Sequence, residues 1–334
     1  MTESSGYTRR DFLGIAAVGA ALPVLGTAEL QAAGSSGNPL SPAELKKRLR
    51  GPIMAIPTPF TKDSEVDYDG VRNMIRLGLD HGIVAYELTS GDSQFHCLSY
   101  DEIKQLTCVL VETVGGKGIA IGCTSEWWTK RAVEYARFCE EIGADGIQIR
   151  LPRGEEDGFV QHVQTIADST KLGLVLQGTG PVTDSLLGKL SVIPSFVGLK
   201  EDKGDTYYFD WQRKFGDRLA VFCGGQKWRF LTGHEYGSMG YLTTFGTFAP
   251  TVTTRFWDAV ERKDLNAARE IVLKYDAPFF DMCLSGKASF HAYWRATLAH
   301  FGVAQPYLRA PEASASDEVR KEIAAFFDNL GLKP

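Results

Sequence analysis

Cysteine is scarce in this sequence, and its cysteines follow no pattern typical of a disulfide scaffold or a zinc site. Six cysteines are spread over 334 residues, without a Cys-x-x-Cys pair and without a cluster of Cys and His. A chain of this length can bury a core without disulfides, and a structural zinc ion needs closely spaced ligands. We therefore expect six scattered thiols and no metal site.

Runs of basic residues and long apolar segments are also missing. Lys and Arg number 36 against 41 Asp and Glu, which gives a formal net charge of −5. Nucleic acids and anionic membranes are bound through clustered positive charge, and a bilayer span needs about 20 apolar residues. The composition, 44% hydrophobic and 23% charged, is instead that of a globular protein. It favours an enzyme with a small-molecule partner, and neither a nucleic acid nor a membrane.

The N-terminus resembles a twin-arginine export signal. Residues 8–13 read Thr-Arg-Arg-Asp-Phe-Leu, and a mildly apolar run over 14–25 and the small residues of 26–28 follow. A translocase that exports folded proteins reads such paired arginines. The alternative is a basic tail with an accidental arginine pair. We assign 1–40 to a signal peptide and linker, with linker-like sequence over 38–42, and expect a periplasmic or exported protein.

From residue 51 onward, short apolar runs alternate with amphipathic stretches. The apolar runs predict eight strands, over 53–57, 84–88, 118–122, 146–151, 173–176, 196–199, 219–223 and 240–244. The stretches between them predict eight helices, over 68–81, 100–114, 128–142, 159–169, 184–193, 207–215, 228–236 and 253–262. Strand–helix units spaced about 25–30 residues apart predict an α/β fold, a (β/α)8 TIM barrel.

A doubly wound sheet has the same alternation and is the main alternative. Its first strand is often followed by a Gly-rich turn that binds phosphate, whereas residues 57–60 here read Pro-Thr-Pro-Phe. Further helical patterns, over 265–275, 288–301 and 316–329, have no strands between them. We therefore expect a barrel over 41–264 and a C-terminal helical extension over 265–334.

Polar residues at the carboxyl ends of the predicted strands are the candidate site, because barrel enzymes place their reacting groups there. The candidates that would move protons or react with substrate are Lys200, Asp92 and His96. The candidates for substrate binding are Thr58, Ser90, Gly91, Ser93, Gln94, Arg150, Gln177, Gly224 and Thr243.

Lys200 follows the strand over 196–199. Strand alternation places Gly198 and Lys200 on one face, so Lys200 points into the barrel mouth if the other face packs on the helices. A lysine that loses solvation there favours its neutral form and can attack a carbonyl to give a Schiff base. The alternative is a lysine that pairs with Glu201 or Asp202 and points to solvent.

Several segments, taken in order, resemble the dihydrodipicolinate synthase/N-acetylneuraminate lyase family. Residues 197–201 (Val-Gly-Leu-Lys-Glu), together with Gly204 and Asp205, resemble the family's Schiff-base lysine segment. The other matching segments are 57–60 with Asp67 and Tyr68, Leu98 and Ser99 with Glu102, and 237–243. Residues 216–225 are similar to the ketodeoxyglucarate dehydratase branch. The resemblance implies a TIM barrel in which Lys200 forms an imine with pyruvate or another 2-keto acid. It also implies no metal or organic cofactor, and a homo-oligomer, commonly a tetramer.

The family's Gly-Thr-Thr-Gly-Glu loop, which binds the keto-acid carboxylate and supplies a relay hydroxyl, falls on 90–94 without gaps, or on 89–92 if gaps are allowed. Backbone donors survive these substitutions, but Asp92 is a different chemical group. The family's tyrosine at the end of the fifth strand is replaced by Gln177, whose amide does not titrate usefully. Val182 stands in place of the arginine that dihydrodipicolinate synthases carry, which argues against their reaction in lysine biosynthesis.

Three functions remain open from the sequence. The leading one is a Schiff-base lyase, an aldolase or dehydratase acting on a 2-keto acid or keto-deoxy sugar acid, with Lys200 as nucleophile and Asp92 or His96 moving protons. In this function Arg150 holds a substrate carboxylate, unless it pairs with Glu155 or Glu156. The others are an exported barrel that binds a sugar acid without catalysis, and an enzyme that uses Asp92 and His96 without an imine.

Overall fold

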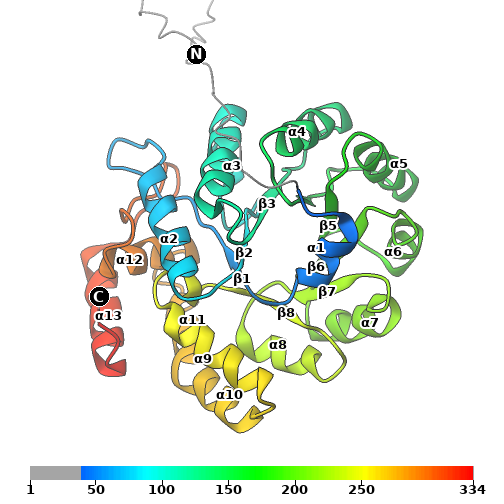
Figure 1. Ribbon diagram of the computed structural model, residues 1–334. Coiled ribbons are helices and arrows are strands. Elements are labelled where there is room, and N and C mark those ends of the chain that lie inside the picture. Colours follow the sequence, from blue (N-terminus) through cyan, green and yellow to red (C-terminus); the bar gives the residue numbers. More distant parts are fainter. Residues whose placement is uncertain (1–38, 334) are drawn as a thin grey trace, which may run out of the picture. The chain divides into compact units, whose positions relative to one another are not determined.

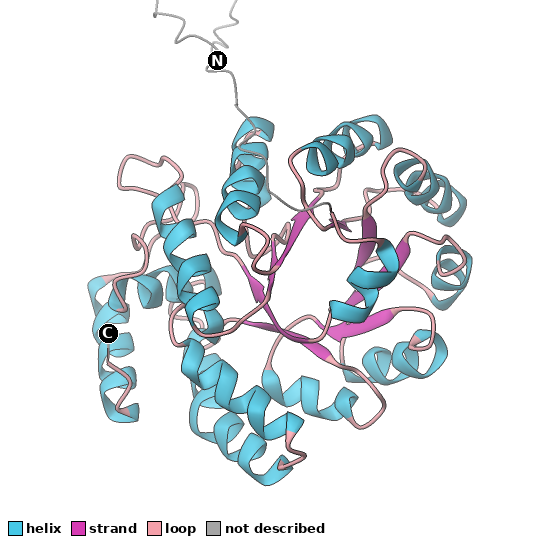
Figure 2. Cartoon of the chain, viewed as in Figure 1, coloured by secondary structure: helices cyan, strands magenta, loops and turns pink. Residues whose placement is uncertain are grey.

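A closed parallel barrel of eight strands forms the centre of the protein, in a computed structural model that describes residues 39–333. The strands pair in sequence order, and β1 closes the barrel on β8 (Figures 1 and 2). Their bounds are β1 Gly51–Ala55, β2 Ala85–Glu87, β3 Ile119–Cys123, β4 Gly146–Ile149, β5 Gly173–Gly178, β6 Phe196–Glu201, β7 Ala220–Cys223 and β8 Gly240–Thr243. The predicted TIM barrel is confirmed, and the doubly wound alternative is wrong because that sheet would stay open.

A helix follows each strand, and together these helices surround the barrel (Figure 2). Their bounds are α2 Tyr68–Asp80, α3 Tyr100–Val114, α4 Thr129–Glu141, α5 Glu156–Ala167, α6 Asp184–Leu190, α7 Asp205–Phe215, α8 Lys227–His234 and α9 Pro250–Glu261. Local signals set their ends: Ser99 and Glu102 form a capping box before α3, and Gly115 takes a left-handed conformation after it. All eight overlap the helices that the hydrophobic pattern predicts.

A helix that the sequence pattern does not predict, α1 (Pro42–Arg48), packs against β5 and β6 at one end of the barrel (Figure 1). Ser41 and Pro42 were expected in a linker, but Ser41 caps the helix and accepts a hydrogen bond from the Glu44 N–H. Leu45 is fully buried. A side chain on Gly146 or Gly173 would come within 2.6 Å of its Cδ2 atom. These two glycines therefore make room for Leu45 at the start of their strands.

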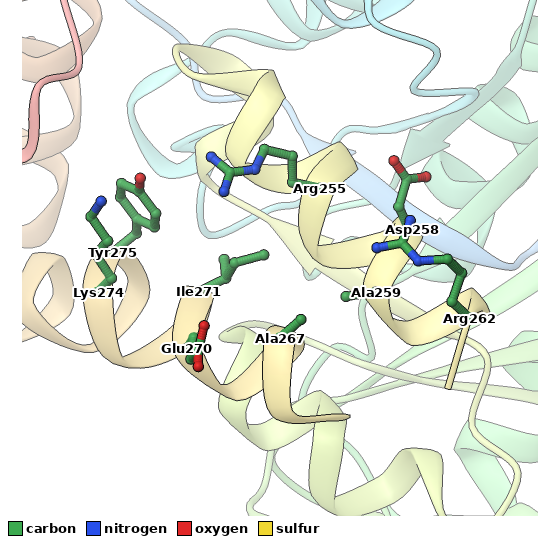
Figure 3. Close-up of a pocket in the computed structure, with 9 residues that line it drawn as sticks. All are labelled: Arg255, Asp258, Ala259, Arg262, Ala267, Glu270, Ile271, Lys274 and Tyr275. Atoms are coloured by element: carbon green, nitrogen blue, oxygen red, sulfur yellow. The ribbon is translucent and has the colours of Figure 1, made fainter. Parts of the chain in front are cut away.

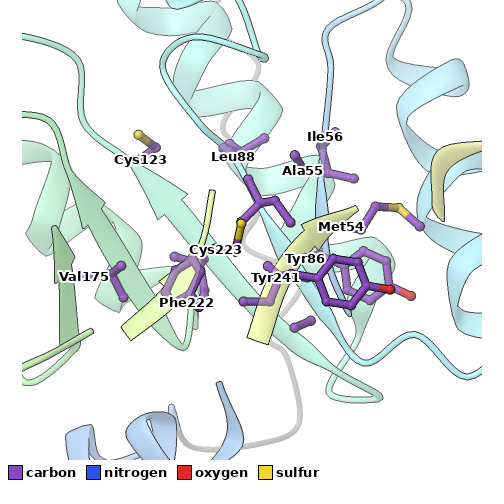
Figure 4. Packing of buried hydrophobic residues seen from close by; sticks show 14 of the residues in the cluster. Met54, Ala55, Ile56, Tyr86, Leu88, Cys123, Val175, Phe222, Cys223 and Tyr241 are labelled. Atoms are coloured by element: carbon purple, nitrogen blue, oxygen red, sulfur yellow. The ribbon is translucent and has the colours of Figure 1, made fainter. Parts of the chain in front are cut away.

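The strands bury both faces (Figure 4). Tyr241 packs outward on Phe256 of α9, with ring centroids 5.4 Å apart. Val175 and Phe222 belong to the inward set, because a side chain on Gly198 would touch Val175 and one on Gly240 would touch Phe222. Burial of both faces is the usual condition of a parallel sheet between helices.

The C-terminal region is helical, as the sequence predicts, but contains an additional helix. It comprises α10 (Leu265–Ile271), a π-helical turn (Val272–Asp276), α11 (Ala277–Cys283), α12 (Phe290–His300) and α13 (Asp317–Leu330). The additional helix is α11. Trp294 of α12 donates its indole N–H to Thr247 Oγ1 at 3.0 Å, just beyond β8. This contact helps to seat α12 beside the carboxyl end of the barrel.

Within residues 39–333, no helix combines the length and the apolar character that crossing a bilayer requires. The predicted export signal, with its arginine pair, lies outside the described residues.

Candidate active site

Four long polar side chains occupy inward positions near the carboxyl ends of the strands. They are Glu87 of β2, Gln148 of β4, Gln177 of β5 and Lys200 of β6, and all four are buried. Gln177 lies directly beside Lys200 in the register of β5 and β6. Both residues lie inside their strands, whereas the apolar pattern ended these strands at 176 and 199. Because the last residues of these strands are polar, a pattern of hydrophobic residues does not recognise them as part of the strands.

Lys200 is held by Asp202 inside the barrel. Its Nζ lies 3.2 Å from Asp202 Oδ2, and the same oxygen accepts a hydrogen bond of 3.2 Å from Gln177 Nε2. Lys200 is 3% exposed. The sequence alternative pairs Lys200 with Asp202 in a side chain that points to solvent, whereas the structure combines this pairing with burial.

The charge on Lys200 differs from the expectation that burial would favour a neutral amine. Burial alone lowers the pKa of Lys200, but the negative charges of Asp202, Asp92 and Glu87 outweigh it, and the pKa lies above its usual value. The predicted neutral form is therefore wrong for the resting site. The carboxylates of Asp202 and Asp92, joined by Glu87 when it is ionised, stabilise the ammonium, so a proton must leave before the nitrogen can attack a carbonyl.

Glu87 is one of the site residues that sequence reasoning missed. It is fully buried, and neither carboxylate oxygen has a hydrogen-bond partner among the described residues. Burial raises its pKa to about 8, although the charge of Lys200 acts in the opposite direction. The signal was available, because a carboxylate stands in an otherwise apolar run over 84–88. A search for polar residues beyond the strand ends does not include Glu87, because this residue lies within the run.

Unpartnered acceptor oxygens are a shared property of this inward layer. Gln148 donates its amide to Leu88 O and Cys123 Sγ, each at 3.4 Å, which leaves its Oε1 without a donor. Gln177 gives its amide to Asp202 and likewise leaves Oε1 without a donor. With the two oxygens of Glu87, the described part of the barrel interior therefore presents four side-chain oxygens without hydrogen-bond partners.

The buried hydroxyl groups of Thr58 and Ser93 hold the loop after β2 against the barrel. Thr58 donates to Ser93 O at 2.7 Å, and Ser93 donates to Ile56 O at 2.6 Å while accepting from the Thr89 N–H. Asp92 donates its backbone N–H to Thr89 Oγ1, and the same hydroxyl donates to Asp92 Oδ2. Ser90 is half-buried and Gly91 is exposed. Thr58 and Ser93 thus hold the loop in place.

Arg295, a second residue that sequence reasoning missed, supports this loop from α12. Its guanidinium donates to Thr58 O and Asp92 O at 3.0 Å and to Gln94 Oε1 at 2.6 Å. Gln94 in turn donates to Glu312. Arg295 is fully buried among these acceptors. It lies about 200 positions from the loop in sequence, so no local sequence pattern predicts the contact.

His96 stands apart from the inward layer. The imidazole is 59% exposed, and its Nε2 lies 2.8 Å from Glu312 Oε1. Glu312 also contacts His291. The structure thus places His96 in a cluster with the C-terminal segment, whereas Asp92 on the same loop lines a cavity at the mouth.

That cavity has a volume of about 180 Å³. Asp92, Gly224 and Thr243 line it together, and aromatic side chains from the C-terminal helices close one side: Phe280 of α11, and Phe290 and Trp294 of α12. Thr243 Oγ1 is bound to Thr253 Oγ1 at 2.8 Å and accepts from the Gly246 N–H. Two of the predicted binding residues, Gly224 and Thr243, therefore meet the predicted proton-moving residue Asp92 at one cavity, and the C-terminal helices form one of its walls.

Arg150 lies on a separate groove of about 480 Å³ at the ends of β4 and β5. It pairs with Glu126 at 3.0 Å and donates to Thr179 Oγ1 at 3.3 Å. The alternative partners proposed from the sequence, Glu155 and Glu156, are wrong. Glu156 instead pairs with Lys189.

A further pocket, of about 370 Å³, lies outside the barrel between α9 and α10 (Figure 3). Charged side chains, among them Arg255, Arg262, Glu270 and Lys274, line it, and none of the predicted site residues does. The chemistry of the candidate site therefore belongs to the barrel mouth.

Comparison with known proteins gives a family for the chain. The sequence model of the dihydrodipicolinate synthetase family matches residues 48–330. A probable 5-dehydro-4-deoxyglucarate dehydratase of Rhizobium meliloti is 28% identical over 255 residues, 72% of this chain and 82% of that protein. A 4-hydroxy-tetrahydrodipicolinate synthase of Magnetococcus marinus is 27% identical over 235 residues, 67% of this chain and 79% of that protein.

Solved structures share the fold. The dihydrodipicolinate synthase of Oceanobacillus iheyensis superposes with a TM-score of 0.79 at 18% identity, covering 87% of this chain and all (100%) of that chain. The corresponding enzyme of Bacillus clausii gives 0.78 at 21% identity, with 86% and 100% covered. The family resemblance and the enzyme class predicted from the sequence, a lyase, are confirmed.

Proposed function

Because this chain belongs to the dihydrodipicolinate synthetase family, we propose that it is a Schiff-base-forming lyase in which Lys200 binds a 2-keto sugar acid as an imine. The observation that carries the proposal is the burial of the Lys200 amine inside the barrel mouth, against Asp202. A protonated imine withdraws electrons from the neighbouring carbon. It therefore stabilises the carbanion that forms when an α-proton leaves or a carbon–carbon bond breaks.

The unpartnered acceptors favour a hydroxylated substrate over pyruvate alone. Glu87, Gln148 and Gln177 present oxygens that lack donors within residues 39–333. Hydroxyl groups along a sugar-acid chain can supply such donors, whereas pyruvate has none. The relatives named 5-dehydro-4-deoxyglucarate dehydratase support the same substrate class and favour loss of water as the reaction. For the carboxylate of the substrate, we assign the backbone N–H groups of the half-buried Ser90 and the exposed Gly91.

Trapping of the imine tests this function. The protein is treated with borohydride in the presence of a 2-keto-3-deoxy sugar acid or of pyruvate, and the adduct is located by mass spectrometry. We expect an adduct on Lys200, formed faster with the sugar acid. Lys200→Met should abolish it, and Lys203→Met, at a neighbouring lysine bound to Val182 O, should not. A protein that forms no adduct with any keto acid would refute the proposal.

We further propose that the mature protein acts outside the cytoplasm. The support is the sequence Thr-Arg-Arg-Asp-Phe-Leu over 8–13 with the apolar run and the small residues that follow. Replacement of Arg9 and Arg10 by lysine should leave the protein unprocessed inside the cell. Export that continues without the two arginines would contradict this assignment.

We also propose a homo-oligomer, a dimer or tetramer. The support is a group of exposed aromatic side chains on and beside α7 and α8, where Phe209 and Tyr236 stack edge to face at 4.5 Å and Trp228 is 41% exposed. Such a group is typical of a contact surface. The molar mass in solution tests it, and a monomer at micromolar concentration would refute it.

A further inference from the structure

Imine formation from a protonated lysine requires a group that first takes and then returns a proton. The ammonium loses one proton to a base, and its free electron pair attacks the keto carbon. A proton then moves from nitrogen to oxygen, which gives a neutral carbinolamine. The protonated base gives its proton to the carbinolamine hydroxyl, the C–O bond breaks, and water leaves as the charged imine forms. The base is restored, and the ammonium and keto group have become iminium and water.

Three carboxylates act on Lys200, and two of them already hold other donors. Asp202 Oδ2 accepts from both Lys200 and Gln177. Asp92 Oδ2 accepts from Thr89 on the loop. A proton that arrived at either Oδ2 atom would displace an existing hydrogen bond, so each of these carboxylates has only its Oδ1 atom free to take one.

Glu87 differs from both. It stands on β2, beside Ala55 in the register of β1 and β2, and Ala55 lines the cavity at the mouth. It is fully buried, and both of its oxygens lack partners among residues 39–333. It can therefore take a proton without breaking any hydrogen bond, and its carboxyl group is shielded from bulk water.

We propose that Glu87 is the residue that exchanges a proton with the substrate oxygen and the Lys200 amine during imine formation. The inference rests on the proposed function, because it presumes an imine at Lys200. Glu87 and Lys200 are not within ion-pair distance of each other in the described structure, so the oxygen of a bound keto group or carbinolamine bridges them. Gln177 cannot take this part because its amide does not titrate, and it instead holds Asp202.

The electrostatics of the site favour this exchange. Burial raises the pKa of Glu87 to about 8, and the positive charge of Lys200 limits this increase. When Lys200 becomes neutral, that charge is lost, and the affinity of Glu87 for the departing proton increases. When the positive iminium forms, the charge returns and Glu87 gives up its proton. The proton affinity of Glu87 therefore increases when Lys200 loses its proton and decreases when the iminium forms, as the reaction requires.

The groups that face Glu87 come from several elements. Lys200 and Asp202 belong to β6 and its end, Asp92 to the loop after β2, and Cys123 to β3. Burial raises the pKa of Cys123 to about 12, so this thiol stays neutral in the relevant range. Titration of Glu87 should therefore appear as a single rise in the rate of imine formation as pH increases through about 8.

The test compares the rate of borohydride trapping in the wild type, Glu87→Gln and Glu87→Asp from pH 6 to pH 10. We expect the wild-type rate to rise with pH and the Gln variant to be about 100-fold slower and to lack that rise. The Asp variant keeps a titrating group and should recover part of the rate. An unchanged rate and pH profile in a folded Glu87→Gln variant would refute the role of Glu87.

A measurement on the wild type covers the case in which Glu87→Gln does not fold. Difference infrared spectra of the full chain with a keto acid should show the carbonyl stretch of a protonated carboxylic acid that disappears as pH rises through about 8. Its absence would overturn the inference. Absence of any adduct on wild-type Lys200 would instead overturn the proposed function, so the two failures are distinguishable.

Discussion

The carboxylate of Asp202 lies in the space that a side chain on Gly224 would occupy. A Cβ built on Gly224 overlaps Asp202 Oδ1 and stands 2.6 Å from the carbonyl oxygen of Glu201. Backbone contact explains the arrangement, because the Gly224 N–H donates to that same Glu201 carbonyl at 2.8 Å. The glycine after β7 thus lets Asp202 turn inward, where its other oxygen meets Lys200 and Gln177.

Gly224→Ala should reduce activity and also lower stability, because the added methyl group meets both Asp202 and the backbone carbonyl of Glu201. The added methyl group would push Asp202 away from Lys200, and displacement of a reacting group by about 1 Å costs about 100-fold in rate. The matched control is Gly225→Ala, since a Cβ at that position meets no atom within 4 Å although Gly225 lines the same cavity. Steady-state kinetics and imine trapping measure both variants. Equal effects of the two substitutions would contradict the explanation.

Asp202→Asn should shift the pH dependence of imine trapping toward lower pH. Burial lowers the pKa of Lys200, and the charge of Asp202 is the largest contribution that raises it. An amide keeps the shape but removes that charge, and the same charge also raises the pKa of Glu87. The pKa values of both groups should fall, so the rise in trapping that follows the titration of Glu87 should begin at lower pH. Asp210→Asn, on the outer helix α7, is the control. A shift toward higher pH would show that Asp202 acts mainly by other means.

Glu87→Gln should make the stability of the protein less dependent on pH. The pKa of Glu87 is about 8 in the folded state, above the usual value of 4.5. Between these values the folded state binds more protons than the unfolded state, so the free energy of unfolding decreases as pH rises. The loss over that window is roughly 4 kcal/mol. Urea unfolding at pH 5 and pH 8 should show a steeper decrease for the wild type than for the variant.

The buried ion pair between Lys227 and Asp276 should cost stability when one partner is removed but little when both are. Its atoms lie 2.7 Å apart, and the two side chains are 2% and 1% exposed. Lys227→Met or Asp276→Leu alone leaves a buried charge unpaired, which costs about 3–5 kcal/mol. The double variant removes both charges and should recover most of that loss. Chemical denaturation of the three variants gives the coupling energy, and additive losses would contradict this prediction.

Different physical signals account for what the sequence could and could not predict. Periodicity and spacing predicted the eight strands and their helices, because burial on both faces of a barrel strand leaves apolar runs. Lys200 was found through its strand position and its neighbours at 197–201. Helix α1 was missed because its proline and serine resemble linker sequence, although they cap a helix. Glu87 was missed because it lies inside a strand and not after it.

Long-range contacts account for the remainder of the site. Phe280, Phe290 and Trp294 close the cavity from helices that follow the barrel in sequence. Arg295 reaches the loop after β2 from the same region, and Glu312 binds His96. None of these contacts has a local sequence signature, since they depend on how the C-terminal helices pack on the completed barrel.

Arg295→Met should destabilise the protein and loosen the loop after β2. The buried guanidinium satisfies Thr58 O, Asp92 O and Gln94 Oε1, and its removal leaves three acceptors without their donor. Each unsatisfied buried acceptor costs about 1–3 kcal/mol, so a loss of about 3 kcal/mol or more in the free energy of unfolding is expected. The loop also carries the N–H groups assigned to the substrate carboxylate, so KM should rise. Arg213→Met, whose side chain is 57% exposed, is the control. A variant with wild-type stability and KM would show that α12 does not support the loop.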